Sequence, residues 1–379
     1  MDPVRSANQV ACLRFLADSG DAQTVGVISA ETGLSRPTVH AVLDDLLGAG
    51  LVVSTDPATV GPGRPARAFQ FARETGLVAG VDLGPRGARA VICDLSGRRV
   101  GYTELQRDRR AGLSLIRRAI DAAAEQGAVD AGRLRAVGLA LPGVIEANGH
   151  LRASLALPEL VGLPIVETVS QDLGLPVALD NDIKLAALAE QRGGAGRGYS
   201  DVVYLQIGHR LSVSIVLNGV IRQGRHRMAG ELGAQRGMRW TRNAQRGQLI
   251  WTSHPSGEAV LSAAAAGDAA ARAEIADFCA QIAGRIATVL LVVDPEVVVV
   301  RGWLAQDSDA LLRPLEAAVE KELLFPERPP FVASALGREA VVLGAVGTAF
   351  DQFSSDIYGI HGYPSPWSRI THDVERTST

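Results

Sequence analysis

Residues 34–52, LSRPTVHAVLDDLLGAGLV, constrain the fold of this chain more than any other stretch, because they fit one short amphipathic helix with identifiable ends. Ser35 is a favoured N-cap residue, and Pro37 lies in the first turn, where its missing N–H costs little. Apolar residues recur with the spacing of a buried helical stripe: Val39, Val42, Leu43, Leu46 and Leu47. The residues left to face outward near the start of this helix are polar or small: Arg36, Thr38, His40 and Ala41.

Two shorter helical patterns come before this helix, and two β-rich runs come after it. Ser6 and Thr24 are expected to cap the two earlier helices, and Gly33 is expected to end the second. A helix, a tight turn and a second capped helix form a helix-turn-helix. The runs in residues 51–71 flank a Gly- and Pro-rich tip, as the two strands of a wing do. We therefore predict a winged helix-turn-helix domain over residues 1–75, with a small helical dimerisation module as the alternative.

A domain of this kind binds double-stranded DNA with its second helix in the major groove. Contacts to bases or phosphates are predicted for Arg36, Thr38 and His40. Contacts to thymine methyl groups are predicted for Pro37 and Ala41. The arginines predicted to enter the minor groove from the wing are Arg64 and Arg67.

Charge and composition set limits on the partners of the chain. Residues 1–75 hold six arginines and eight acidic residues, so one domain alone is expected to bind DNA modestly and to need a homodimer or homotetramer. The net charge of −3 over 379 residues favours no particular partner. The first residues show no signal-peptide core, and we find no run of about 18 uncharged apolar residues. We therefore expect a cytoplasmic protein with no membrane partner.

The rest of the chain alternates strands and helices, which is typical of an α/β fold. One set of paired strands is predicted to begin at Gly76, and a second set near residue 201. This pattern predicts a first lobe over 76–190, a second lobe over 191–360 and a cleft between them. Residues 361–379 are expected to form a flexible polar tail.

Several motifs occur in an order and spacing that resemble the ROK family of repressors, open reading frames and sugar kinases. They are GPGRPAR (61–67), LALPGVIEANG (139–149), LDNDIKLAALAE (179–190) and AGELGA (229–234). The resemblance implies a two-lobed actin-like ATPase (sugar-kinase-like) domain behind the winged helix. It also implies operator DNA as a partner, a sugar as a frequent effector, and the repressor branch, because ROK kinases lack the winged helix.

The three elements that bind nucleotide in ROK kinases are altered here. The first phosphate loop, DxGGT in the kinases, reads Asp82-Leu83-Gly84-Pro85-Arg86, so a proline removes an N–H donor. The second, GTGIGGG in the kinases, reads GHRLSVS over 208–214, and the adenosine loop reads RGW over 301–303. Phosphoryl transfer needs glycine loops whose N–H groups approach the phosphates. We therefore expect no nucleotide cofactor and no enzyme activity.

The zinc site of the family is also expected to be absent. The resemblance places its histidine and three cysteines at Ala234, Thr241, Asn243 and Gln248. Three cysteines far apart in the chain, Cys12, Cys93 and Cys279, offer neither a disulfide framework nor a zinc cluster. We hypothesise that Trp240 and Trp251 supply apolar packing in place of the metal.

Half of the sugar-binding positions of the family remain. Asn181, Asp182 and Glu231 match, whereas Ala156, Ala234 and Ile250 replace the other polar residues. We predict that the three matching residues bind a sugar or another small polar effector, or that the site is vestigial. In the alternative reading Asn181 and Asp182 cap a helix and Glu231 is a solvated loop residue.

Together these patterns predict a DNA-binding transcriptional regulator, a repressor of sugar or related catabolic genes, with a non-catalytic effector domain. One alternative is a sugar kinase with an accessory DNA-binding head. The other is a regulator whose lobes respond to a protein partner.

Overall fold

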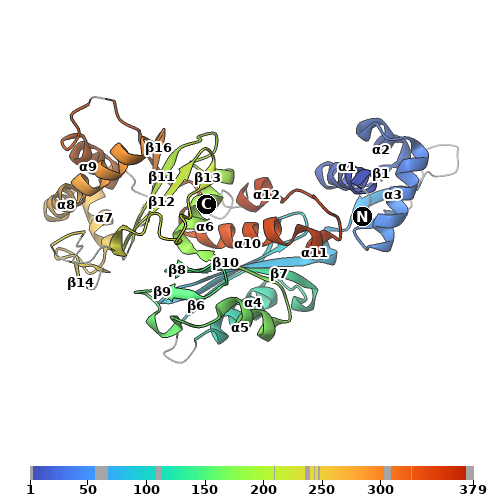
Figure 1. The fold of residues 1–379 in the computed structure, drawn as a ribbon, viewed down its shortest axis with the longest axis horizontal. Coiled ribbons are helices and arrows are strands. Elements are labelled where there is room, and N and C mark those ends of the chain that lie inside the picture. The colour runs from blue at the N-terminus through green and yellow to red at the C-terminus, as the bar shows by residue number, and fades with distance from the viewer. Residues whose placement is uncertain are drawn as a thin grey trace.

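The computed structural model describes residues 3–55, 67–107, 112–208, 210–234, 240–242, 244–245, 248–302, 309–325 and 327–372. Figure 1 shows a small N-terminal domain at one end of the molecule and two larger α/β lobes beside it. The predicted fold class, a winged helix-turn-helix followed by a two-lobed α/β domain, is confirmed.

The N-terminal domain has three helices and a three-stranded sheet. These elements are α1 (Pro3–Ser19), β1 (Gln23–Thr24), α2 (Val25–Thr32), α3 (Arg36–Gly48), β2 (Val52–Thr55) and β3 (Ala68–Phe71). The Thr24 and Ser35 side chains accept hydrogen bonds from the first turns of α2 and α3, as predicted. Gly33 ends α2 with φ of 70°, which favours glycine. The apolar stripe of α3 is buried against α1, with Leu43 fully covered.

The predicted cap at Ser6 is wrong. Helix α1 begins at Pro3, and Ser6 lies inside it, only 7% exposed. Proline is favoured in the first turn of a helix because its missing N–H has no intrahelical partner there. The helix therefore starts before Ser6, and that side chain faces the interior.

The first lobe is built on a five-stranded sheet with the order β10-β7-β4-β5-β6. Its strands are β4 (Leu77–Leu83), β5 (Gly87–Asp94), β6 (Arg99–Gln106), β7 (Leu134–Leu141) and β10 (Val177–Asn181). Strands β4, β5 and β6 form an antiparallel meander, and β7 and β10 add in parallel. One face is covered by α4 (Ser114–Gln126) and α5 (Ile165–Leu173). A hairpin of β8 (Val144–Ile145) and β9 (Leu151–Ala153) lies near the end of β10.

The second lobe repeats this plan with the order β13-β12-β11-β16-β17. Its strands are β11 (Val202–Ile207), β12 (Leu211–Leu217), β13 (Val220–Ile221), β16 (Val297–Gly302) and β17 (Phe331–Ala333). Three antiparallel strands are again followed by two parallel ones. The helices on its outer face are α7 (Gly257–Ala265), α8 (Ala269–Val293) and α9 (Asp309–Glu320). Helix α6 (Asp182–Gly193) lies between the two sheets.

By length and composition, α8 is the one helix within the described ranges that could cross a membrane. Its inner side contributes Ile275, Phe278, Ile282 and Ile286 to the core of the second lobe. The helix therefore has a packing role in this lobe, which accounts for its apolar sequence.

The C-terminal helices return to the first lobe, which the sequence pattern did not predict. They are α10 (Ala340–Gln352), α11 (Ser354–Tyr358) and α12 (Trp367–His372). Helix α10 packs on β4 and β7, whereas the predicted division assigned residues up to 360 to the second lobe.

The prediction of a flexible polar tail over 361–379 is wrong for residues 361–372. Tyr363, Trp367 and Ile370 are buried in the same core as α10, and the Trp367 indole N–H donates to Asp351 at 3.1 Å. Three apolar residues spaced by three or four positions are enough to anchor this segment. Residues 373–379 lie outside the described ranges.

Candidate functional site

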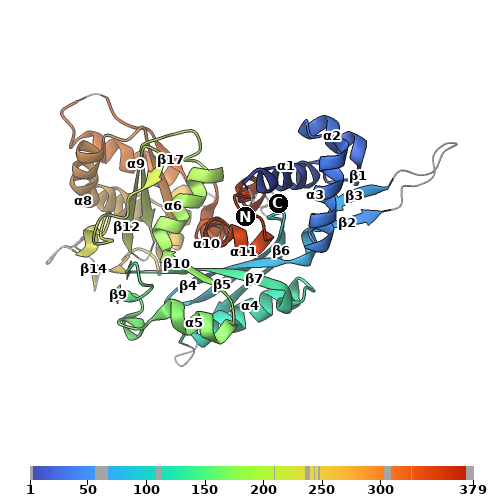
Figure 2. The same cartoon turned by 45° about the vertical axis from the view of Figure 1, so that its right-hand side comes forward.

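The leading turn of α3 presents the residues that the sequence predicted for major-groove contacts. Arg36, Pro37, His40 and Ala41 are exposed, and Thr38 is half-buried. The Thr38 hydroxyl lies 2.8 Å from the hydroxyl of Ser35, so part of its hydrogen-bonding capacity is already used at the cap. Figure 2 shows the N-terminal domain beside the C-terminal helices, with β2 and β3 directed away from both lobes. The leading turn is thus accessible to a large partner.

An ion pair with α1 partly neutralises the acidic end of α3. Arg5 donates to Asp45 at 2.8 and 2.5 Å, and Gln9 adds a third hydrogen bond at 3.2 Å. The hydrogen bond from Arg5 lowers the pKa of Asp45. Asp45 therefore stays ionised but paired, and its field opposes an approaching phosphate less than a free carboxylate would.

Of the two predicted wing arginines, only Arg67 lies within the described residues. Its guanidinium donates to the Ser54 hydroxyl at 3.0 Å and lies 5.3 Å from the centre of the Phe69 ring. Arg67 is therefore held at the base of the wing by its own strand pair. Arg64 lies outside the described ranges.

Asn181, the first predicted effector residue, is an N-cap in the structure. Its Oδ1 accepts from the Lys184 N–H at 3.2 Å, and its Nδ2 donates to the Gly143 carbonyl at 2.8 Å. The side chain is only 4% exposed. The alternative capping role is thus confirmed for Asn181, and both ends of its amide are already bonded within the protein.

Asp182 follows in the first turn of α6 and faces a group of charges from both lobes. Burial, together with the neighbouring carboxylates of Asp82 on β4 and Glu231, raises the pKa of Asp182 to about 6. Arg301 of β16 acts in the opposite direction. The side chain of Arg301 also donates to Gln206 at 2.6 Å and to the Gly337 carbonyl at 3.1 Å. Acids of the first lobe therefore meet an arginine of the second.

Glu231 lies on the loop 222–231, which is joined to α6 by a buried lysine. Lys184 is 3% exposed, and its ammonium donates to Gln223 at 3.0 Å and to the Arg227 carbonyl at 3.2 Å. Gln223 in turn donates to Asp180 at 2.6 Å. Burial raises the pKa of Glu231, and Lys184 lowers it. This network therefore joins the loop that carries Glu231 to the start of α6, which carries Asp182.

Sequence reasoning missed Lys184, Gln223 and Asp180. One signal was available, because the chain has only two lysines and Lys184 lies among the apolar residues of α6. A lone charged residue on a buried face needs partners, and these come from the loop 222–231.

The two phosphate-loop positions have their N–H groups engaged within their own turns. The N–H of Gly84 donates to the Gly87 carbonyl at 2.9 Å, and the N–H of Gly208 donates to the Arg210 carbonyl at 3.1 Å. The side chain of Arg210 reaches the Leu155 carbonyl of the first lobe at 3.2 Å. Both N–H groups therefore already donate to carbonyl groups of the protein. His209 and Trp303 lie outside the described ranges.

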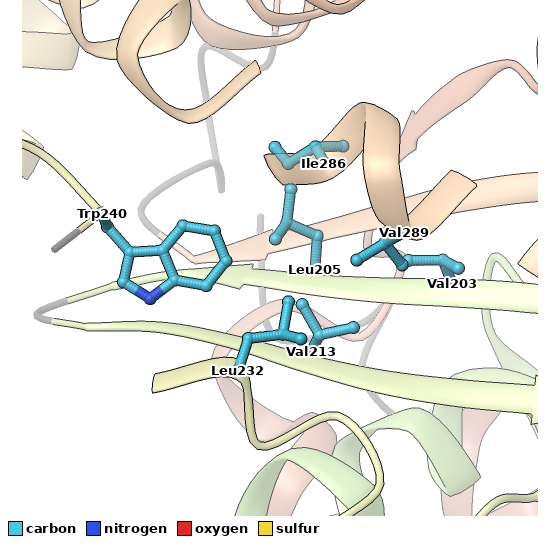
Figure 3. A pocket seen from close by; sticks show the side chains of 7 residues that line it. All are labelled: Val203, Leu205, Val213, Leu232, Trp240, Ile286 and Val289. Atoms are coloured by element: carbon cyan, nitrogen blue, oxygen red, sulfur yellow. The ribbon is translucent and has the colours of Figure 1, made fainter. Parts of the chain in front are cut away.

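Apolar side chains gather near the positions at which the resemblance places the zinc ligands of the family. Trp240 is 5% exposed and borders an apolar cavity of about 10 Å³ together with Leu205, Leu232 and Ile286 (Figure 3). The Trp251 ring lies 5.1 Å from that of Phe278 on α8. Both tryptophans therefore pack against the hydrophobic core of the second lobe, which is the apolar packing that we hypothesised. Two short strands, β14 (Ala244–Gln245) and β15 (Gln248–Leu249), lie between them in the chain. Within the described ranges, no three His, Cys, Asp or Glu side chains gather closely enough to hold a metal ion.

Comparison with protein families finds two matches that together span most of the chain. A sequence model of the ROK family matches residues 78–243 and 237–351. A model of the MarR family matches residues 5–61.

Individual relatives include both enzymes and regulators. The bifunctional enzyme NanE/NanK of Brucella suis biovar 1 is 32% identical over 238 residues, which are 59% of this chain and 44% of that protein. The xylose repressor of Caldicellulosiruptor bescii is 26% identical over 212 residues, 54% of this chain and 53% of that protein. The chain thus spans about half the length of these relatives.

A solved structure covers nearly the whole chain. The ROK family transcriptional regulator described as a homolog of the E. coli MLC protein has a TM-score of 0.65 at 22% identity, over 99% of this chain and 100% of that one. This likeness shows that the two chains share the fold of a winged helix followed by two lobes.

Proposed function

We propose, from the premise that the chain belongs to the ROK family, that it is a DNA-binding transcriptional regulator with a non-catalytic effector domain. The observation that carries this proposal is the exposed leading turn of α3 in a winged-helix domain. The xylose repressor relative supports a repressor of sugar or related catabolic genes. Such a protein would act in the cytoplasm, as a homodimer or homotetramer on double-stranded operator DNA.

Residues 1–75 form the DNA-binding domain in this proposal. Helix α3 lies in the major groove, where its leading turn contacts bases and phosphates. The residues that make these contacts are Arg36, Pro37, Thr38, His40 and Ala41. Arg64 and Arg67 approach the minor groove from the wing.

The lobes bind an effector and do not transfer phosphate. The engaged N–H groups of Gly84 and Gly208 support this, because a nucleotide would have to break those hydrogen bonds. Asp182 and Glu231 supply carboxylates for the hydroxyl groups of a sugar or similar polar molecule. Asn181 orients this site through its cap. The network of Lys184 and Gln223 sets the distance between the two carboxylates.

DNA selection tests the DNA-binding role. The full chain is incubated with a random duplex library, and the recovered sequence is titrated by fluorescence anisotropy at several salt concentrations. We expect saturable, sequence-dependent binding that the double variant Arg36→Ala/His40→Ala weakens roughly 30-fold or more, since each base contact contributes about 1–3 kcal/mol. Arg313→Ala is the matched control, because that arginine is 79% exposed on α9 of the second lobe. Equal affinity for unselected DNA, with no effect of the α3 substitutions, would refute the proposal.

A sugar kinase is the second candidate, and two observations favour it. The NanE/NanK relative is a bifunctional enzyme, and the pKa of Asp182, raised to about 6, suits a general base. The test is an ATP-dependent phosphorylation assay with N-acetylmannosamine and glucose, with Asp182→Asn as the comparison. We expect no turnover above that of the variant, whereas turnover that depends on Asp182 would establish the kinase.

A sugar panel in a thermal-shift assay distinguishes the remaining alternative. A ligand that binds the folded chain stabilises it by RT ln(1 + [L]/Kd) and so raises its unfolding temperature. No shift with any sugar would favour regulation by a protein partner.

A further inference from the structure

Helix α6 touches both lobes along its length. Leu185 and Ala189 pack in the core that contains α10, and Ala187 packs against Tyr204 and the second sheet. The fit to α10 is close, because a Cβ at Gly344 would overlap the Leu185 carbonyl. Figure 2 shows α6 in this intermediate position, with α10 beside it. A displacement of α6 would therefore be transmitted to its neighbours.

The N-terminal end of α6 lies at the proposed effector site. Asn181 caps the helix, Asp182 occupies its first turn, and Lys184 joins it to the loop that carries Glu231. A ligand that pulled Glu231 toward Asp182 would act on this end of the helix directly.

The C-terminal end of α6 contacts α12. A Cβ at Gly193, the last residue of α6, would overlap the Thr371 hydroxyl oxygen. Thr371 is 5% exposed, and its hydroxyl donates to the Trp367 carbonyl within α12 at 2.9 Å. The two helices therefore meet with no free space between Gly193 and Thr371. Since a helix rises about 1.5 Å per residue, the contact lies roughly 18 Å from the effector end.

Helix α12 in turn holds the winged-helix domain. The guanidinium of Arg369 donates to the Ala17 carbonyl at 2.6 Å and lies 3.8 Å from Asp18. Ala17 is in the last turn of α1, where carbonyl groups lack intrahelical partners and a cation is favoured. We call this set, Arg369 with Ala17 and Asp18, the α12–α1 contact.

The opposite half of α1 borders an open cavity of about 580 Å³, which is lined by Pro3, Ala7 and Val10 of α1 and by His361 and Gly362. Helix α1 is thus hydrogen-bonded to α12 near its C-terminus and has room beside its N-terminal half. A shift of α12 would therefore tilt α1 about Ala17, together with α3, to which α1 is joined through Arg5 and Asp45.

We propose that α6 and α12 connect the interlobe site mechanically to the winged-helix domain, with Arg369 as the residue that positions α1. This inference rests on the proposed function only in taking the interlobe site as the place where a ligand acts. Movement of α6 reaches α12 through Gly193 and Thr371, and α12 reaches α1 through Arg369.

Amide hydrogen exchange of the full chain tests the α12–α1 contact without DNA or an effector. In Arg369→Gln, exchange in α1 and α2 is expected to rise about tenfold, the size expected for the loss of one charge-assisted hydrogen bond, while both lobe sheets are unchanged. Arg369→Lys keeps the charge and restores most of the protection. Gly193→Ala raises exchange in α12 and α1 from a distance. Gly284→Ala on α8, where only the end of the Glu322 side chain is near, is the control.

Coupling is tested from the effector end. Lys184→Met removes the join between α6 and the loop 222–231, and we expect it to change exchange in α12 and α1. In the Arg369→Gln background it should no longer change α1. If Lys184→Met does not fold, Asp182→Asn replaces it. An effect confined to α6 and its loop, or an equal effect on α1 in both backgrounds, would overturn the proposal. DNA selection is independent of these measurements, so either result can fail alone.

Discussion

The leading turn of α3 and the region between the lobes both contain basic and other polar side chains, but their surroundings differ. On α3, Arg36 and His40 are exposed to solvent. Between the lobes lie Arg301, Lys184 and Asn181, here called the interlobe residues, and each is hydrogen-bonded to another part of the protein. The comparison teaches that residue type alone does not identify a binding site. Exposure on α3 leaves groups available to a partner, whereas the interlobe residues hold the structure in place.

The proposed function assigns regulation, and not phosphoryl transfer, to this fold. A phosphate loop needs N–H groups that can donate to a ligand, and those of Gly84 and Gly208 donate within their own turns. The proposal therefore leaves two carboxylates, Asp182 and Glu231, as the groups that would bind an effector.

The largest expected effect concerns Arg301. Arg301→Ala removes the hydrogen bonds to Gln206 and Gly337 and the positive charge near Asp82 and Asp182. We expect a loss of about 3 kcal/mol in the free energy of unfolding in urea, because Asp182 loses the arginine that acts on it, whereas Asp82 keeps its ion pair with Arg89. Adding Asp82→Asn should recover part of this loss. An Arg301→Ala variant as stable as the parent would show that the packing between the lobes does not depend on this arginine.

The next effect separates the roles of the two α3 residues. Arg36→Ala alone should weaken binding to the selected duplex by about 1–3 kcal/mol without changing thermal stability, because the residue is exposed. If Arg36 contacts a phosphate, the slope of log K against log salt should fall by about one; if it contacts a base, discrimination at that position should be lost. If Arg36→Ala changed the melting temperature and left the DNA affinity unchanged, Arg36 would have a structural role like that of the interlobe residues.

The pH dependence of stability tests whether the folded chain raises the pKa of Asp182 and so disfavours its ionised form. Burial raises its pKa from 3.8 to about 6, so the folded chain binds this proton more tightly than the unfolded chain. Ionisation above pH 6 therefore lowers stability, and Asp182→Asn should be more stable than the parent at pH 8, by up to about 3 kcal/mol. The difference should shrink as the pH falls through 6 and disappear below about pH 4.

Asp309→Asn is the control for this measurement, because Asp309 is 71% exposed on α9. A difference between Asp182→Asn and the parent that is the same at pH 5 and pH 8 would contradict the assignment.

The smallest expected effect is at the base of the wing. Arg67→Ala removes a hydrogen bond to Ser54 and the contact with Phe69, which together should contribute less than about 1 kcal/mol to stability. Its effect on DNA affinity should be larger than that of Arg14→Ala, an exposed arginine of α1. Equal effects of the two substitutions on DNA affinity would remove Arg67 from the interface.

Local signals in the sequence were enough to predict the helices of the N-terminal domain. The caps at Thr24 and Ser35 and the buried stripe of α3 follow from residues within one helix. The alternation of strands and helices likewise predicted two lobes.

Long-range contacts were not predictable in the same way. The partners of Arg301 and Lys184 lie 36 to 95 residues away, and those of Arg369 lie 352 residues away. A sequence shows that a charged residue is present, but its partner depends on how distant elements pack. The burial of Tyr363 and Trp367 was missed for this reason, since their cover comes from the core around α10.

The central claim is that α3 is available to DNA, whereas the groups between the lobes are not available to a nucleotide. Its most direct test is a pair of titrations on one preparation of the full chain. Isothermal titration calorimetry is run with magnesium and a non-hydrolysable ATP analogue, and then with the selected duplex. We predict no nucleotide binding with a Kd below about 1 mM and saturable binding of the duplex. Tight binding of the nucleotide without binding of the duplex would contradict the account.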